Sequence, residues 1–489
     1  MTRLRSLRTG VVASTVLVGS LAWTAPIRHL HVALRASEPA ANDTLATPPR
    51  AIRLEFTQAI EVPLSRVTLT GRDSIELSLS PARAADSTDR AIVADVASAM
   101  QAGSYRVRWT VTSRDSHTIR GEYAFTVLRA AADTSLAATR AIDADSSAAS
   151  TTGEQTAGDS AEFDAQSPAY VLVRWLTYAG MLGVIGALLF RVAVLRTAQR
   201  RHSMDDPATA MAFRTALSGA RVGGIVAAVV LLIAAVLRLA AQLRTVVGEM
   251  TFDPAMTRAL LTDTEWGWGW IAQVVAALTA LGIAARRDDL TSNVSIAPVE
   301  IVGGLAAVAL AVSAALSGHP AAATPAWLAV GLDAGHVLAA GGWIGTLAYV
   351  ALAGVPATSC MQPDCRPPVV RDLITSFSNV AVVCVAAIVL TGLAAAWIQM
   401  QSVPALWTTP YGRVLLIKLG LFALVGAVGA YNWRVTTPRV LATGGISRLR
   451  AAIAFELGFA VLLLGATAVL VATPPPAEAM GVPASAVAP

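Results

Sequence analysis

Cysteine and charged residues are scarce in this sequence of 489 residues. Its three cysteines are Cys360, Cys365 and Cys384, so the first half has no disulfide framework and needs a hydrophobic core for stability. Only 14% of the residues are charged and 55% are hydrophobic, which is too little charge to wet the surface of a soluble chain of this length. The composition therefore indicates a membrane protein.

Motifs of nucleotide-driven and redox enzymes are absent as well. No Walker A pattern occurs, which argues against ATP-driven pumping, and no reductase motif is visible. The net charge is +5, but most basic residues lie in short loops between apolar runs, which is typical of membrane topology. We therefore expect neither an enzyme nor a nucleic-acid partner.

The N-terminal part alternates apolar and polar residues with period two, as strands with one buried face do. The alternating segments are 52–56, 66–70, 75–79, 105–111 and 123–127. Turn residues such as Gly71 and Gly103 separate them. About seven short strands in roughly 100 residues predict a small all-β sandwich over residues 31–129.

The segments outside the β-domain and the apolar region differ from both in composition. Arg3, Arg5 and Arg8 precede an apolar stretch, which predicts a signal peptide or signal anchor over residues 1–30 and export of the β-domain. Residues 130–168 are rich in Ala, Ser, Thr and Asp and predict a flexible linker. We expect a disordered tail over residues 474–489.

Eight apolar segments fill residues 169–473, each close to the roughly 20 residues that a bilayer requires. They lie at 170–190, 219–243, 266–285, 296–316, 326–353, 377–397, 414–433 and 451–471. Because backbone polar groups cannot stay unpaired in lipid, these segments predict an all-α polytopic bundle of about eight helices.

Arginines in the loops predict the orientation of the bundle. They concentrate after the first, third, fifth and seventh helices, whereas residues 317–325 and 401–410 hold none. Arginine-rich loops stay in the cytoplasm, so the first helix starts outside. This places the protein in a bacterial plasma membrane with the β-domain on the periplasmic or extracellular side.

Two pairs of possible metal ligands lie in the β-domain. His29 and His31 are two residues apart, and so are Asp115 and His117. In an extended strand such residues share a face, so each pair can present two donors in one direction. Imidazoles with a carboxylate suit Cu(II) or zinc. The alternative is that these are exposed polar residues of loops.

The predicted helices contain few ionisable residues, which usually face a bundle interior. His319 follows the fourth helix, and Asp333 and His336 share one face of the fifth, with His336 about 15 Å from its start. They are candidate metal ligands, although His336 can also be a structural hydrogen-bonding residue. We expect Arg238 to extend to the membrane surface, as Lys418 can, and Glu456 can be an interfacial charge.

The β-domain also resembles the CopC family of periplasmic copper-binding proteins. The resemblance rests on residues 31–34 (HVAL), 37–39 (SEP) and 109–117 (WTVTSRDSH), followed by Gly121 and Phe125. It implies a Greek-key, immunoglobulin-like sandwich and a Cu(II) site formed by His31, Asp115 and His117. Since Leu30 precedes His31, a free amine at His31 is in doubt, and His29 is a possible substitute ligand.

The helical part resembles the CopD family of copper-resistance membrane proteins. The motifs are residues 317–319 (SGH), 333–336 (DAGH), 342–345 (GWIG), 377–378 (FS), 391–392 (TG), 411–418 (YGRVLLIK) and 431–432 (YN). The resemblance implies copper import, or membrane handling linked to periplasmic resistance. In this interpretation His319, Asp333 and His336 lie on the membrane path, and the copper there is Cu(I) or Cu(II).

The sequence thus predicts copper binding outside the membrane and copper transport, probably import, in copper homeostasis or resistance. Copper ions and the lipid bilayer are the expected partners, with periplasmic or cytosolic copper chaperones as further candidates. Two alternatives remain: a membrane copper-buffering protein without transport, and a haem-binding membrane redox protein, because histidines on helices can ligate haem.

Overall fold

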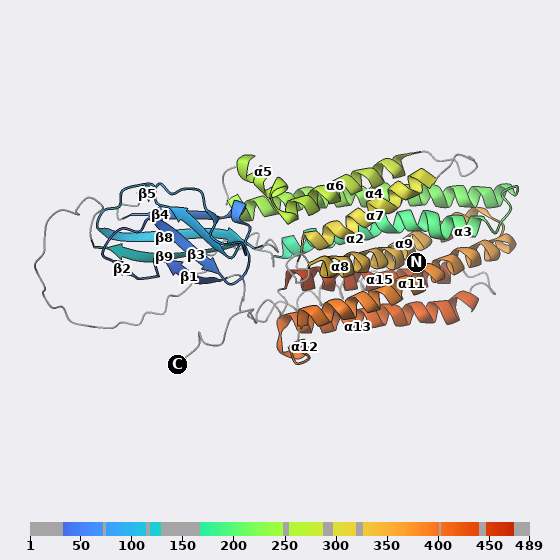
Figure 1. Ribbon diagram of the computed structural model, residues 1–489. Coiled ribbons are helices and arrows are strands. Elements are labelled where there is room, and N and C mark those ends of the chain that lie inside the picture. Colours follow the sequence, from blue (N-terminus) through green and yellow to red (C-terminus); the bar gives the residue numbers. More distant parts are fainter. Residues whose placement is uncertain are drawn as a thin grey trace, which may run out of the picture. The chain divides into compact units, whose positions relative to one another are not determined.

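The computed structural model describes residues 33–71, 75–113, 118–128, 167–247, 254–286, 297–318, 326–400, 402–439 and 446–473. These residues form two compact units, one holding the strands from Leu34 to Val127 and one holding most of the helices from Pro168 to Ala472 (Figure 1). The predicted signal segment and tail lie outside the described residues, as does the predicted linker except for Ser167 and Pro168.

The first unit is a β-sandwich of two sheets. One sheet has the order β1-β3-β7-β6 and the other the order β2-β9-β8-β4-β5. The strands are β1 (Leu34–Glu38), β2 (Thr44–Leu45), β3 (Ala51–Phe56), β4 (Arg66–Thr70), β5 (Glu76–Leu77), β6 (Arg83–Ala84), β7 (Ala91–Asp95), β8 (Gly103–Thr112) and β9 (Thr118–Val127), with a 3-10 turn η1 (Val62–Leu64).

Alternation of apolar and polar residues with period two explains β3, β4, β8 and β9. In β3, Ile52, Leu54 and Phe56 are at most 1% exposed, while the residues between them are half-buried. Only β5, with two residues, forms in the predicted segment 75–79. Strand β7 lies outside the alternating segments because three of its five residues are fully buried, which hides the period of two.

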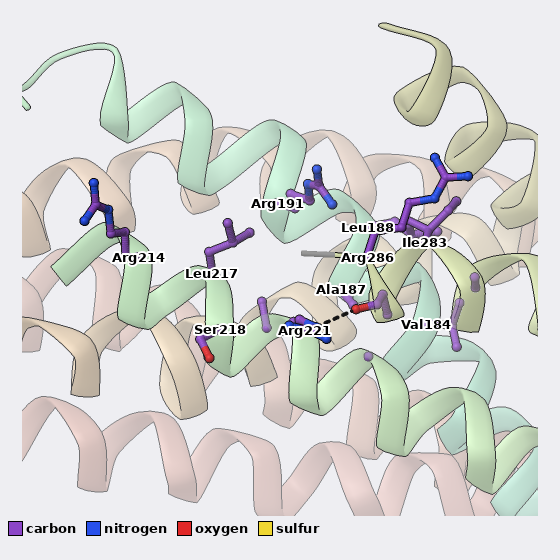
Figure 2. A pocket seen from close by; sticks show the side chains of 14 residues that line it. Val184, Ala187, Leu188, Arg191, Arg214, Leu217, Ser218, Arg221, Ile283 and Arg286 are labelled. Carbon is purple, nitrogen blue, oxygen red and sulfur yellow. Dashed lines mark hydrogen bonds between the residues drawn. The ribbon is translucent and has the colours of Figure 1, made fainter. Parts of the chain in front are cut away.

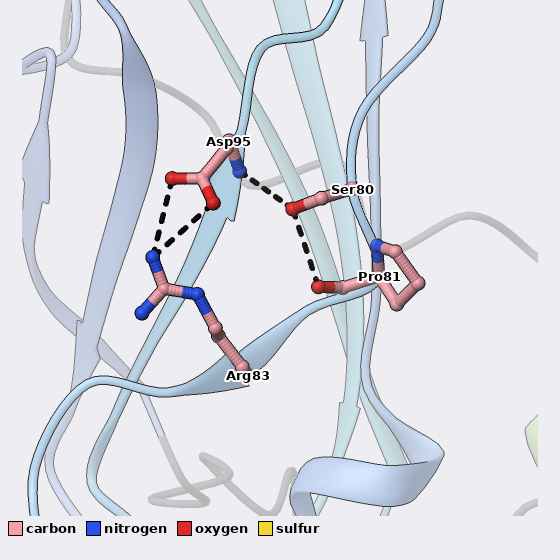
Figure 3. A network of polar contacts seen from close by, with 4 residues as sticks. All are labelled: Ser80, Pro81, Arg83 and Asp95. Atoms are coloured by element: carbon pink, nitrogen blue, oxygen red, sulfur yellow. Dashed lines mark hydrogen bonds and ion pairs between the residues drawn. The ribbon is translucent and has the colours of Figure 1, made fainter.

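A short polar network joins β6 to β7 at the edge of the first sheet (Figure 3). Arg83 Nη2 donates to both carboxylate oxygens of Asp95 at 3.2 Å, and the Asp95 backbone N–H donates to Ser80 Oγ at 2.8 Å. The Arg83 and Asp95 side chains are 61% and 52% exposed, so the ion pair contributes little stability. The network instead supports the pairing of β6 with β7 at this edge of the sheet.

The second unit is the helical bundle. Eight of its helical segments are long and apolar enough to cross a membrane, which confirms the predicted number among the described residues. These spans are Pro168–Gln199, Pro207–Arg244, Glu265–Ala285, Pro298–Leu316, Ala326–Cys360, Arg366–Met400, Pro410–Arg439 and Ser447–Ala472. Since most exceed the required length, the apolar runs predicted their cores and not their ends.

The spans are built from labelled elements as follows: α2 (Pro168–Leu189), η2 (Phe190–Leu195), α3 (Arg196–Gln199), α4 (Pro207–Val247), α6 (Glu265–Ala285), α7 (Ala297–Leu316), α8 (Ala326–Ala340), η4 (Gly341–Gly345), α9 (Thr346–Tyr349), η5 (Val350–Gly354), α10 (Val355–Ala357), η6 (Thr358–Cys360), α11 (Arg366–Met400), α13 (Pro410–Tyr431), η8 (Asn432–Thr436) and α15 (Ile446–Ala472). Shorter helices in the connections are α5 (Pro254–Thr262), η7 (Pro363–Cys365) and α12 (Ala405–Thr408).

Glycine permits one especially close helix contact. A Cβ on Gly345, in the π-helical segment η4, would overlap the carbonyl oxygen of Leu182 and lie 3.0 Å from Gly186 Cα on α2. Small residues allow such backbone approach within membranes. This contact fixes η4 against α2 and thereby positions α8, which precedes η4.

Candidate metal centre

His336 lies on α8 and points its ring toward α11. Its Nδ1 is 3.0 Å from Thr391 Oγ1, and the ring is half-buried. The single hydroxyl proton of Thr391 is donated to the Ala387 carbonyl oxygen at 2.7 Å. With that proton engaged, the hydroxyl can accept from a protonated Nδ1, and in this tautomer the Nε2 lone pair is able to bind a metal.

Gly392 makes room for this imidazole. A Cβ at position 392 would lie 3.3 Å from His336 Cε1, and a Cβ at Gly335 would lie 3.6 Å from Thr391 Cγ2. The helices α8 and α11 thus approach each other where the ring sits. A metal-binding histidine typically donates its second ring N–H to a fixed acceptor, and Thr391 supplies one here.

Asp333 and Lys418 bring charge to the same region. Asp333 is half-buried one turn before His336, and it interacts electrostatically with Lys418 on α13. Lys418, the only lysine in the sequence, is half-buried and also interacts electrostatically with His336. Sequence reasoning allowed Lys418 to extend to the membrane surface, whereas the structure places it half-buried and within electrostatic range of the two candidate ligands.

Trp343 lies further along the same span. It is 4% exposed, and its ring packs edge-on against Phe422 with centroids 5.8 Å apart. Phe422 is one turn beyond Lys418 on α13, so α13 follows the span from His336 to Trp343. Bulky apolar packing therefore joins this span to α13 two turns beyond His336.

The remaining predicted ligands lie outside the described residues: His29, His31, Asp115, His117 and His319. Within the described part of the chain, no three His, Cys, Asp or Glu side chains gather in a way that could hold a metal ion. The ligand sets therefore stay predictions.

The described residues beside the β-domain ligands lie at one end of the sandwich. Ala33 N–H donates to Thr57 Oγ1 at 3.0 Å, and Ala33 O accepts from Thr57 N–H at 3.0 Å. Ser113 forms a β-bridge with Ile60. Thr57 and Ile60 are three residues apart in the chain, so at most about 10 Å separates the points to which Ala33 and Ser113 are bonded.

Two buried polar pairs contradict the sequence analysis. Arg238 is 7% exposed and donates from Nη1 to Gln273 Oε1 at 3.1 Å, so the prediction that it extends to the membrane surface was wrong. Glu456 is 3% exposed and accepts from Asn432 Nδ2 at 3.1 Å, so it is not an interfacial charge. Their partners lie 35 and 24 residues away, beyond any local signal.

Comparison with known protein families gives three matches along the chain. The CopC domain matches residues 34–128, the copper resistance protein D-like N-terminal domain matches residues 164–330, and copper resistance protein D matches residues 371–470. Asp333 and His336 lie between the last two matches, whereas Thr391, Gly392 and Lys418 lie within the third.

Individual relatives agree with these matches. Copper resistance protein D of Pseudomonas syringae pv. tomato is 28% identical over 64% of this chain and 99% of its own length. Copper transport protein CutJ of Bacillus subtilis (strain 168) is 24% identical over 91% of this chain and 75% of its own length. Copper resistance protein C of Escherichia coli is 32% identical over 24% of this chain and 98% of its own length. The chain therefore belongs to the copper-resistance family, as a multi-pass membrane protein in which a CopC domain precedes a CopD membrane domain.

Proposed function

We propose that this protein binds copper at its β-domain outside the cytoplasmic membrane and imports it through the helical bundle. Capture uses His31, Asp115 and His117 as Cu(II) ligands. Passage uses His319 and His336, with Asp333 nearby, for Cu(I) or Cu(II). Copper is the cargo of the protein in this proposal, and the chain is not an enzyme.

The arrangement of His336 carries the membrane half of the proposal. A bare metal ion cannot enter hydrocarbon because its solvation free energy is lost, so a path needs donors inside the bundle. Thr391 orients the His336 ring and favours the tautomer protonated at Nδ1, which supports Nε2 as such a donor. The ring is ten residues into α8, about 15 Å along the helix from its first residue.

The β-domain half is supported by the positions of Ala33 and Ser113. Both flank predicted ligands, and both bond to the stretch 57–60 that follows β3. Hydrogen bonds to one short stretch restrict where residues 31 and 115 can lie, which favours a shared metal site over separate exposed side chains.

Copper uptake by proteoliposomes tests the proposal. The full chain is reconstituted with a copper-sensitive dye inside, and the wild type is compared with His336→Ala and with His202→Ala. His202 pairs with Asp372 through Nε2 at 2.8 Å and lies outside the candidate path, so it is the matched control. We expect uptake by the wild type and the control and at least about a tenfold loss in His336→Ala.

Each alternative function predicts a different result. Copper binding without uptake by the wild type would indicate a buffering protein. A Soret band in the visible spectrum of the purified protein would indicate a haem protein. Equal uptake by the wild type and His336→Ala would remove His336 from the path.

A further inference from the structure

Two exposed cysteines, Cys360 and Cys365, lie where the fifth span passes into the sixth. Cys360 ends η6 and Cys365 ends η7. The fifth span is the one that carries Asp333 and His336, and Cys360 follows His336 by 24 residues, or about 36 Å at the rise of an α-helix. A pair of thiols thus stands at the end of the span that holds the candidate metal ligands.

Arg366 holds the two cysteines on one compact connection. Its Nε donates to the Met361 carbonyl oxygen at 2.7 Å, and its Nη2 donates to the Ser359 carbonyl oxygen at 2.9 Å. These two acceptors flank Cys360 in the chain, and the donor directly follows Cys365. The guanidinium therefore ties the backbone on both sides of Cys360 to the residue next to Cys365.

The middle of this connection is anchored in the protein core. Met361 is 3% exposed and belongs to the same buried cluster as Val355 and Val369. The Cys365 backbone N–H donates to the Gln362 carbonyl oxygen at 3.0 Å and closes the second turn. Because these contacts fix the backbone before any ligand arrives, they lower the entropy cost of binding one ion with both thiols.

Sulfur donors decide which ion suits this pair. Thiolates select soft ions such as Cu(I), whereas structural zinc sites almost always use four ligands. No group of three His, Cys, Asp or Glu side chains gathers within the described residues, so Asp364 does not join the two cysteines in a larger site. The Cys360 thiol donates to the Ala357 carbonyl oxygen at 3.1 Å, a weak bond that ends when metal binding releases the thiol proton to solvent. Two sulfurs without a third ligand therefore favour Cu(I).

Arginines mark the end of the bundle at which this connection lies. Arg201, in the connection after the first span, donates to Asp372 near the start of α11 at 3.1 Å. Further arginines line a cavity of about 460 Å³ between the first three spans (Figure 2), namely Arg191, Arg214, Arg221 and Arg286. Arginine-rich connections predict the cytoplasmic side of a membrane protein, where thiols stay reduced and able to bind a metal.

We propose that Cys360 and Cys365 together bind one Cu(I) ion at this end of the bundle. Each thiol gives up its proton when the ion binds, and no electron is transferred. The place of this site at the end of a copper path rests on the proposed function, whereas the binding itself requires no transport.

Iodoacetamide labelling of the purified, reduced full chain tests the site, with peptide mass spectrometry reporting each cysteine separately. Buffered Cu(I) or Zn(II) is added to the wild type, to Cys360→Ser, to Cys384→Ser and to His336→Ala. Cys360 is exposed, so its replacement leaves the packed core intact. Cys384 is half-buried on α11, away from the connection, and its replacement is the control for the loss of one thiol.

We expect Cu(I) to slow the alkylation of Cys360 and Cys365 at least about tenfold in the wild type and in Cys384→Ser. In Cys360→Ser, Cys365 should react at its metal-free rate, because one thiol does not hold the ion. Protection should persist in His336→Ala, so failure of the proposed import and failure of this site are separate results. Unchanged alkylation of the wild type with Cu(I), or protection of Cys365 in Cys360→Ser, would overturn the shared site. Equal protection by Zn(II) would overturn the assignment to Cu(I).

Discussion

His336 Nδ1 and Thr391 Oγ1 lie 3.0 Å apart although 55 residues separate them in the chain. The hydroxyl can accept from the ring because its own proton is donated to the Ala387 carbonyl oxygen. Thr391 thus favours the tautomer protonated at Nδ1, and the Ile388 backbone is a second hydrogen-bond partner of the ring. Two predictions test this relationship directly, and two more test the packing that supports each unit.

Replacement of Thr391 by valine should weaken copper handling without removing the imidazole. The variant loses the acceptor of the Nδ1–H group, so the ring can rotate or change tautomer, and metal affinity should fall about tenfold or more. Thr467→Val is the matched control, because Thr467 is also half-buried and donates to a carbonyl four residues earlier, Leu463, at 2.9 Å. Copper titration of the full chain measures the difference. Equal affinities in the two variants would contradict the orienting role.

Replacement of Gly392 by alanine should impair copper uptake while the protein stays folded. The new Cβ would lie 3.3 Å from His336 Cε1 and push the ring away from Thr391. Alanine within a helix otherwise stabilises by about 0.5–1 kcal/mol, so a loss of uptake would not reflect unfolding. Gly426→Ala on α13 meets no atom within 4 Å and is the control. Normal uptake by Gly392→Ala in the proteoliposome assay would show that the ring tolerates displacement.

Replacement of Gly121 by alanine should destabilise the β-sandwich. Gly121 pairs with Trp109 across β8 and β9, and a Cβ there would lie 2.7 Å from Trp109 Cε2. Trp109 also packs edge-on against Phe56 with centroids 5.3 Å apart, so the indole has little room to move. The expected cost is about 1–3 kcal/mol.

Hydrogen exchange of the β8 and β9 peptides in the full chain measures this cost locally. Exchange should accelerate in Gly121→Ala and stay unchanged in Ser104→Ala, which alters an exposed position of the same hairpin. Unchanged exchange in Gly121→Ala would mean that Trp109 can adopt another rotamer.

Removal of the Asn432 amide should destabilise the bundle. Asn432→Leu leaves the 3%-exposed Glu456 side chain without its 3.1 Å donor, at a cost of about 1–3 kcal/mol. The double variant Asn432→Leu/Glu456→Leu should recover part of the loss, because it removes the buried carboxyl group together with its donor. Thermal melting of the purified protein in detergent measures both. Additive losses in the double variant would argue against coupling of the two side chains.

The period of the apolar alternation and the length of the apolar segments were enough to predict the architecture from the sequence. Alternation marked β3, β4, β8 and β9, because a strand with one buried face must repeat every two residues. Apolar length marked all eight spans among the described residues, because lipid requires about 20 residues that need no water. Neither rule reached β7, in which Ala91, Ile92 and Ala94 are all buried, or the π-helical segments such as η4.

Tertiary structure alone decided which polar side chains meet. The sequence marks His336, Asp333 and Lys418 as ionisable residues within helices, and the packing of α8, α11 and α13 gives His336 an acceptor and brings Lys418 within electrostatic range of it. It likewise buries Arg238 against Gln273 and Glu456 against Asn432. The physical reason is range: hydropathy and periodicity report how each segment meets its solvent, whereas hydrogen bonds between distant helices depend on rotation and approach that no single segment encodes.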